Sequence, residues 1–470
     1  MITVAGDPQP VEEKQPMTTT GPASQRDVVP FRQAVRAWFA ISLQTFGGPA
    51  GQIAVMQRHL VDERRWIGQR RFLHALNYCM LLPGPEAQQL AIYVGWLLNG
   101  LRGGLVAGTL FVLPGMVALL ALSAIYAGYG DTTVVTALFA GLAPAVVAIV
   151  AQAVWRLGSR ALTSRLLVGF AVTAFLALAV FGVPFPIVVA LAGLAGWVLL
   201  RRQPPPAAHG SGDDGPAPLI SDDALHDDRP SARRTATILT VGLVLWFLPV
   251  VLVAVTTGTG SVFTQQGLFF SGAAVVTFGG AYAVLAFVAQ RAVEYYGWLS
   301  AGDMVRGLAL AETTPGPLIM VVQFVAFLGA YHHPGTLDPW VAGVVASLLT
   351  TWVTFVPCFL FILLGAPYVE RLRGNVALSA ALTGITAAVV GVIANLGLYF
   401  AVHTLFATVT TGPLSLQVPD PASIRWVPVG IAAVAAVLIF TLKWPVLRVL
   451  GVCAVLGLIA GLTLPPHLVG

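Results

Sequence analysis

The sequence predicts an all-α integral membrane protein made of two inverted repeats, with helices that are broken inside the membrane. Three observations predict this class. Hydrophobic residues make up 57% of the 470 residues and charged residues only 10%, whereas a soluble domain usually carries about a quarter charged residues. Charge-free apolar runs recur at residues 105–130, 134–154 and 166–200, and a helix needs roughly 20 apolar residues to cross a bilayer. Finally, one set of glycine and proline motifs occurs twice along the chain.

The chain begins with a polar segment, residues 1–30, that is rich in Pro, Thr and Gln. It lacks the basic start, the apolar stretch and the small-residue cleavage site of a signal peptide, so we interpret it as a disordered cytoplasmic tail. The three cysteines, Cys79, Cys358 and Cys453, lie in apolar segments and form no CxxC pair. They predict neither a disulfide framework nor a metal site.

The internal repeat is the most informative feature of the sequence. Three motifs recur at one offset of 232 residues (277 − 45, 298 − 66 and 315 − 83): Thr45-Phe46-Gly47-Gly48 as Thr277-Phe278-Gly279-Gly280, Trp66 as Trp298, and Pro83-Gly84-Pro85 as Pro315-Gly316-Pro317. Further on, Pro114 pairs with Pro357 and Gly141 with Gly384 at an offset of 243 (357 − 114 and 384 − 141). We therefore predict a first repeat at residues 31–200 and a second at 258–470.

A polar linker, residues 201–234, separates the two repeats and is flanked by arginine pairs. Under the positive-inside rule these arginines place the linker in the cytoplasm. One extra apolar span, residues 235–257, follows it without a partner in the first half. Because this connecting span is single, the second repeat is predicted to enter the membrane upside down, as in many transporters.

The segment from residue 58 to 71 tests how the first repeat crosses the membrane, because it holds five arginines. If residues 31–56 crossed once, this basic segment would lie outside, against the positive-inside rule. Broken helices that enter and return on one side keep it cytoplasmic. We favour this re-entrant arrangement, with about nine full spans and four hairpins; simple crossings, with about thirteen spans, stay open as the alternative.

The FGGP and PGP motifs stand in the middle of apolar stretches, where they break helices. Each break starts a half-helix whose free N–H groups and partial positive charge suit a tetrahedral oxyanion. The competing interpretation is that these residues only kink helices or let them pack closely. The candidate substrate-binding residues lie at and beside the four breaks: Thr45, Phe46, Gly47, Gly48, Pro49, Pro83, Gly84, Pro85, Gln88, Gln89, Thr277, Gly279, Gly280, Thr313, Thr314, Pro315, Gly316 and Pro317.

Two acidic side chains lie beside the breaks, Glu86 and Glu312. A carboxylate next to a dianion repels it unless protonated, and carboxylates inside a membrane are costly, so both are candidates for proton coupling. The alternatives are that Glu86 caps its half-helix and that Glu312 pairs with Arg306. Candidate anion-contacting cations are Arg58, Arg102 and Arg306, since a guanidinium binds an oxyanion in bidentate fashion; as ordinary anchors at membrane ends they would have no such role.

These motifs also carry a resemblance to a known family. The strings TFGGPAGQIAVM (residues 45–56), LLPGPEAQQLAIYVGW (81–96) and TTPGPL (313–318) resemble the signatures of chromate ion transporters, in their long-chain two-domain form. The order FGG, Trp, PGP and a proline-bearing span recurs in both halves, and the resemblance covers about residues 31–464. The second half departs from the pattern, with Ala281 where Pro49 stands and no Glu-x-Gln after its PGP.

The resemblance implies export of chromate, resistance to chromate, and sulfate as a competing substrate. It implies a multi-pass protein of the inner (plasma) membrane that needs no cofactor, binds no nucleic acid and is a candidate homodimer in the lipid bilayer. The membrane potential favours this direction, because each charge that crosses is worth roughly 2.3 kcal/mol per 100 mV and a dianion about twice that. Drive by the potential and by a proton gradient both stay open.

Two other functions stay open at this point. The first is a transporter of sulfate or another anion that works as a symporter, in which the two acids carry protons. The second, from a different class, is a membrane-embedded enzyme or sensor. No catalytic or nucleotide-binding motif of the types GxSxG, HExxH or GxxxxGK[ST] occurs in the sequence, so we expect no enzymatic activity.

Overall fold

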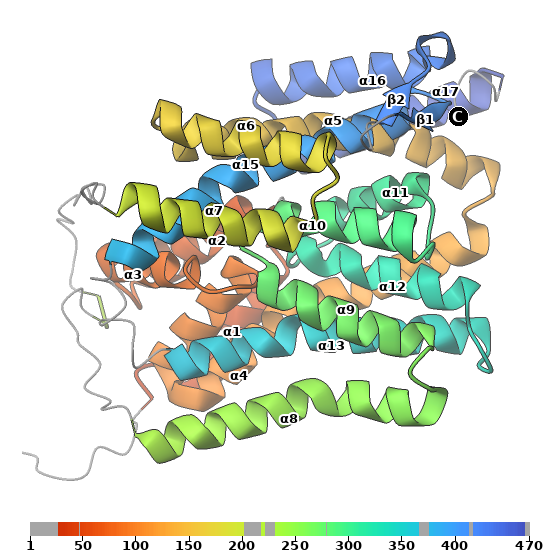
Figure 1. The fold of residues 1–470 in the computed structure, drawn as a ribbon. Coiled ribbons are helices and arrows are strands. Elements are labelled where there is room, and N and C mark those ends of the chain that lie inside the picture. Colours follow the sequence, from red (N-terminus) through yellow and green to blue (C-terminus); the bar gives the residue numbers. More distant parts are fainter. Residues whose placement is uncertain are drawn as a thin grey trace, which may run out of the picture.

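The computed structural model describes residues 27–46, 48–201, 218–220, 231–278, 280–365, 376–412 and 417–465, and these are almost entirely helical. The predicted tail and most of the predicted linker lie outside these ranges. Most helices run along one common direction (Figure 1). We call the end of the bundle where residues 201 and 231 lie the linker end, and the opposite end the far end. The prediction of an all-α membrane fold is confirmed.

Six of the described helices are long and apolar enough to cross a membrane. They are α4 (Glu86–Tyr129), α5 (Thr133–Ala161), α8 (Ala232–Thr257), α13 (Pro339–Gly365), α15 (Val376–Leu405) and α17 (Val446–Thr463). Helix α8, the extra span, lies at one side of the bundle against α9 and α13 (Figure 1). Most of its side chains are exposed, as expected for a helix that faces lipid.

The first repeat begins with two hairpins of short helices. Helices α1 (Phe31–Ser42), α2 (Gly48–Gln57) and α3 (Gln69–Cys79) have 10 to 12 residues, which is about 15–18 Å and half of a bilayer core. Helix α4 is also broken, because Asn99 and Gly100 have non-helical backbone angles. The amide of Asn99 donates to the Val29 carbonyl at 2.6 Å, so the start of α1 and the break in α4 lie at the same end. These hairpins enter and return at the linker end (Figure 1), as the re-entrant arrangement predicts.

The second repeat has the same elements in the opposite orientation. It comprises α9 (Val262–Val276), α10 (Ala281–Gln290), α11 (Ala301–Thr313), the short η3 (Leu318–Met320) and α12 (Val321–His332). Element starts follow the sequence offsets: α11 begins 232 residues after α3 (301 − 69), η3 begins 232 after α4 (318 − 86), and α15 begins 243 after α5 (376 − 133). A π-helical turn follows α2 and α10 alike, as η1 (Arg58–Glu63) and η2 (Arg291–Tyr295). Since α8 crosses first, these hairpins start from the far end (Figure 1).

Each repeat ends with a further pair of helices against one long helix. Helices α6 (Arg165–Ala179) and α7 (Phe185–Leu200) pack on α15, while α17 and α16 (Trp426–Ala436, continued by η7, Val437–Thr441) pack on α5. The repeat-related glycines mark both contacts. A Cβ at Gly141 would lie 1.9 Å from the Cys453 carbonyl oxygen of α17, and one at Gly384 would lie 2.6 Å from the Ala192 carbonyl oxygen of α7.

The number of full spans differs from the prediction of about nine. Helices α6 and α7 have 15 and 16 residues, about 22–24 Å each. Their turn therefore stops short of the far end (Figure 1), where Gly182–Pro186 was expected. The far end instead carries a two-stranded hairpin of β1 (Val409–Thr411) and β2 (Gln417–Pro419), followed by η6 (Pro421–Ser423).

The centre of the bundle is formed by the two returning half-helices. Every residue from 87 to 98 in α4 is buried, and so is every residue from 321 to 330 in α12. All four broken segments therefore end in the interior, away from both ends of the bundle. This position decides what can reach them.

Candidate substrate site at the four broken helices

The four breaks meet through two crossed backbone hydrogen bonds. The Gly84 amide donates to the Thr277 carbonyl at 2.8 Å, and the Gly316 amide donates to the Thr45 carbonyl at 2.9 Å. Thr45 and Thr277 are repeat partners, and so are Gly84 and Gly316, so the two bonds are symmetric counterparts. The FGG motif of each half thus holds the PGP motif of the other half.

The local sequence explains why the chain turns at these positions. Proline on both sides of Gly84 and Gly316 removes backbone donors and disfavours helix in the preceding residue. The two glycines have φ of 119° and 98°, a region that other residues rarely adopt. Phe46, Gly48 and Gly280 flank the partner breaks, while Gly47 and Gly279 lie outside the described residues.

The half-helices that start at the breaks have no side-chain caps. Residues Pro85, Gly280 and Pro317 precede the starts of α4, α10 and η3, and none provides a capping hydrogen bond. Their first N–H groups therefore keep the partial positive charge of a helix N-terminus. The amides of Gly84 and Gly316 are already used in the crossed bonds, so the donors left for an anion come from the residues just after each PGP.

The predicted polar side chains differ in what they can offer. Gln88 is fully buried, and neither its amide nitrogen nor its oxygen has a hydrogen-bond partner within the described chain. Gln89 donates to the Pro83 carbonyl at 2.7 Å. The hydroxyls of the four predicted threonines each donate to a carbonyl three or four residues earlier: Thr45, Thr277, Thr313 and Thr314. In this conformation Gln88 is the unpaired donor and the threonines are not.

Two residues that sequence reasoning missed complete this region. The Gln52 amide on α2 donates to the Gly316 carbonyl at 2.6 Å, across the two halves. The Tyr282 hydroxyl on α10 donates to the Glu312 carboxylate on α11. Both were visible as polar residues four or five positions after an FGG motif, each within an apolar stretch.

Both acidic residues lie at the breaks and meet no described cation. The Glu312 side chain is 2% exposed, and the alternative pairing with Arg306 is not formed, since Arg306 instead lies 3.8 Å from Asp303. The Glu86 carboxylate lies near the partner break, with Oε1 3.6 Å from where a Cβ on Gly280 would be. Glu86 provides no cap, because α4 is preceded by Pro85 and has no side-chain capping bond.

The three predicted cations lie away from the breaks. Arg58 is exposed at the linker end, 3.6 Å from Glu63, and Arg102 is exposed just beyond the kink of α4. Arg306 lies near the start of α11, towards the far end. The structure therefore brings the FGG and PGP motifs and both acids together, but not the arginines.

Comparison with known proteins now places this architecture. The sequence profile described as "Chromate transporter" matches residues 32–197 and 264–458, one match in each half. The chain belongs to the chromate transporter family. Both matched regions contain an FGG and a PGP motif, so the crossed bonds join the two family regions of one chromate transporter chain.

Several named relatives cover most of this chromate transporter. The "Chromate transport protein" of Pseudomonas aeruginosa is 32% identical over 77% of this chain and 79% of its own length. The "Chromate transport protein" of Cupriavidus metallidurans is 29% identical, over 81% and 85%. The "Probable chromate transport protein" of Synechococcus elongatus is 27% identical, over 87% and 96%. No solved structure matches the chain.

Proposed function

We propose that this member of the chromate transporter family exports chromate from the cytoplasm across the inner (plasma) membrane and so confers chromate resistance. The observation that carries the proposal is the pair of crossed bonds, which brings four uncapped breaks together in the buried centre of an inverted repeat. The names of the relatives support chromate as the transported ion. Export follows the field, since a dianion leaving a negative interior gains about 4.6 kcal/mol per 100 mV.

In the proposed site the anion lies beside the starts of α4, α10 and η3. The free N–H groups of these starts and the unpaired Gln88 amide supply donors, and the absence of a side-chain cation from the breaks keeps binding weak enough for release. Protonation of Glu86 and Glu312 removes the charges that would oppose a dianion. Proton coupling through these acids therefore stands beside drive by the potential alone.

The proposed orientation has the linker end in the cytoplasm. The segment 58–71 with its five arginines lies at that end, and linker residues contact it, the Leu219 and Ile220 amides donating to the Arg65 and Trp66 carbonyls at 3.1 and 3.0 Å. This agrees with the positive-inside rule. The proposed organisation keeps the tail at 1–30, repeats at 31–200 and 258–470, the linker at 201–234 and the extra span at 235–257.

The test is chromate uptake into energised, everted membrane vesicles that contain the protein. We expect accumulation that depends on the protein and on energy, with sulfate as a competitor. An ionophore that dissipates only the potential separates potential-driven from proton-driven transport. Vesicles that take up no chromate above those without the protein would remove chromate export as the function.

The second candidate is proton-coupled symport of sulfate or another oxyanion. The buried pair of Tyr282 and Glu312 favours it, because a carboxyl without a cation is suited to bind and release a proton. Uptake into right-side-out vesicles that collapses with the proton gradient would establish this function. Uptake in everted vesicles alone would support export.

A further inference from the structure

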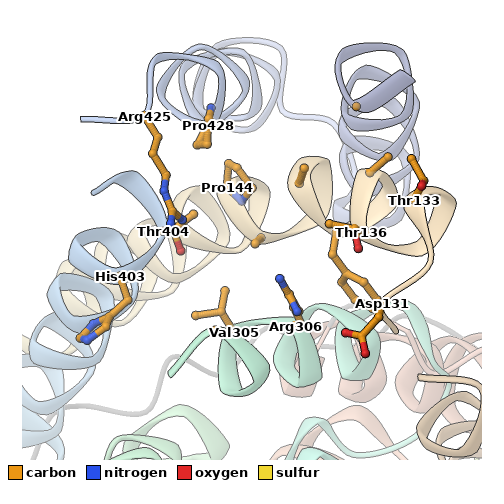
Figure 2. Close-up of a pocket in the computed structure, with 16 residues that line it drawn as sticks. Asp131, Thr133, Thr136, Pro144, Val305, Arg306, His403, Thr404, Arg425 and Pro428 are labelled. Carbon is orange, nitrogen blue, oxygen red and sulfur yellow. The ribbon is translucent and has the colours of Figure 1, made fainter. Parts of the chain in front are cut away.

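A cavity of about 380 Å³ opens at the far end, separate from the four breaks (Figure 2). It lies between α5, the start of α11, the end of α15 and the start of α16. At about 30 Å³ per water, a space of this size holds on the order of ten water molecules, enough for a partly hydrated oxyanion. Arg306 in the cavity precedes Thr313 at the PGP break by seven residues, about 10 Å along α11. The cavity therefore lies next to the central site, towards the far end.

Two arginines from different elements line the cavity and face each other. Figure 2 shows the Arg425 side chain reaching in from the start of α16 towards Thr404, while Arg306 points in from α11 on the opposite side. The Arg425 side chain makes no hydrogen bond or ion pair with any described residue, and its Nε is buried. Burial, together with the charge of Arg306, lowers the pKa of the Arg425 guanidinium. A buried charge without a partner is unfavourable, so this position calls for an anion.

The cavity also offers a neutral hydrogen-bonding group in a dry position. The Thr404 side chain is 7% exposed, and its Oγ1 has no hydrogen-bond partner in the described chain. A buried hydroxyl without a partner costs about 1–3 kcal/mol. An oxyanion between Arg425 and Thr404 would satisfy both groups at once.

The acidic residues nearby do not fill this role. Asp303 is already saturated, because its carboxylate accepts from the Ser300 amide and hydroxyl at 3.1 and 2.6 Å and from the Tyr126 hydroxyl at 2.5 Å. It lies 3.8 Å from Arg306, a distance that leaves most of the guanidinium donors of Arg306 unused. Asp131 is exposed at the rim of the cavity, where solvent and salt screen its charge.

We propose that this cavity is a second oxyanion site, in which Arg425, Arg306 and Thr404 bind the anion on its way between the central site and the far side. The identity of that anion as transported chromate rests on the proposed function. The chemistry, a tetrahedral oxyanion held by two guanidinium groups, also fits the phosphate of an anionic lipid. The experiment therefore separates these two sources.

The test uses the full-length protein in nanodiscs of zwitterionic lipid, with Arg425→Cys labelled by a cationic methanethiosulfonate reagent. The three natural cysteines do not interfere because they are 0–1% exposed. We expect sulfate or chromate to slow labelling several-fold. The matched control is Arg291→Cys, also towards the far end but stacked over Tyr295 at 4.8 Å and not in the cavity lining, whose labelling the anions should leave unchanged. If anionic lipid protects Arg425→Cys and the free anions do not, the site binds a lipid headgroup and the proposal is overturned.

Flux measurements in proteoliposomes provide a second readout. Arg425→Gln should raise the half-saturating chromate concentration at the far face about tenfold, as expected for loss of a charged hydrogen bond, and Arg425→Lys should recover most of it. Wild-type half-saturation in Arg425→Gln, with no anion protection of the cysteine variant, would overturn the site while leaving chromate transport intact. Protection by sulfate in a protein that moves no chromate would support the site and remove the proposed substrate.

Discussion

Replacement of Gly316 by alanine tests whether the crossed backbone geometry belongs to the transport site. At φ of 98° a residue with a Cβ costs about 1–3 kcal/mol. The new Cβ would lie 3.4 Å from the Gly115 Cα, an ordinary contact, so backbone strain accounts for most of the cost. To relieve it, the peptide must rotate away from the Thr45 carbonyl and the Gln52 amide. If the binding-competent state bears this strain, flux falls about 5- to 150-fold.

The assay is chromate flux in everted vesicles, normalised to the amount of protein in the membrane. Gly169→Ala on α6 is the matched control, because a Cβ there meets no atom within 4 Å, and it should retain wild-type flux. Gly84→Ala should lose more than Gly316→Ala, since its Cβ would also lie 2.9 Å from the Gln89 amide nitrogen and 3.0 Å from the Cys358 sulfur. Wild-type flux in Gly316→Ala, at a normal protein level, would refute the reasoning.

Three further changes probe the same architecture. Gln52→Leu leaves the buried Gly316 carbonyl without its donor, which costs about 1–3 kcal/mol and should lower both the melting temperature in detergent and the flux; an unchanged melting temperature would contradict the contact. Asp62→Cys, exposed in the turn after α2, should react with an impermeant thiol reagent only from the cytoplasm, and Tyr295→Cys, 68% exposed in the equivalent turn, only from outside. Glu312→Gln should keep potential-driven flux and lose its response to a pH gradient; a response that persists in the variant excludes this acid from coupling.

The sequence predicted the repeat and its breaks because both depend on local chemistry. Glycine and proline break helices wherever they stand, and a constant offset needs only an alignment of the chain with itself. The five arginines of residues 58–71 added the information that the breaks re-enter. Helix starts at Gln69 and Ala301 then follow the offset without exception.

What the sequence could not predict depends on how the halves are placed against each other. A repeat shows that Thr45 and Thr277 are equivalent, but not that each binds the PGP motif of the opposite half. The short α6 and α7 were missed for a simpler reason: the turn between them uses residues 180–184 of an apolar run that looked long enough for two spans. Arg425 carried a signal that was not used, as it follows a far-end loop with only one other charge, Asp420, among residues 403–424.

The two halves share a backbone but not the side chains that act at the site. At an offset of 232, Glu86 corresponds to Leu318 (86 + 232) and Glu312 to Met80 (312 − 232). Inverted repeats let one scaffold open to either side by exchange of conformations between its halves. With equal side chains, the two open states of such a scaffold would have equal energy. Because each acid belongs to one half only, a proton bound or released at either site favours one of these states over the other.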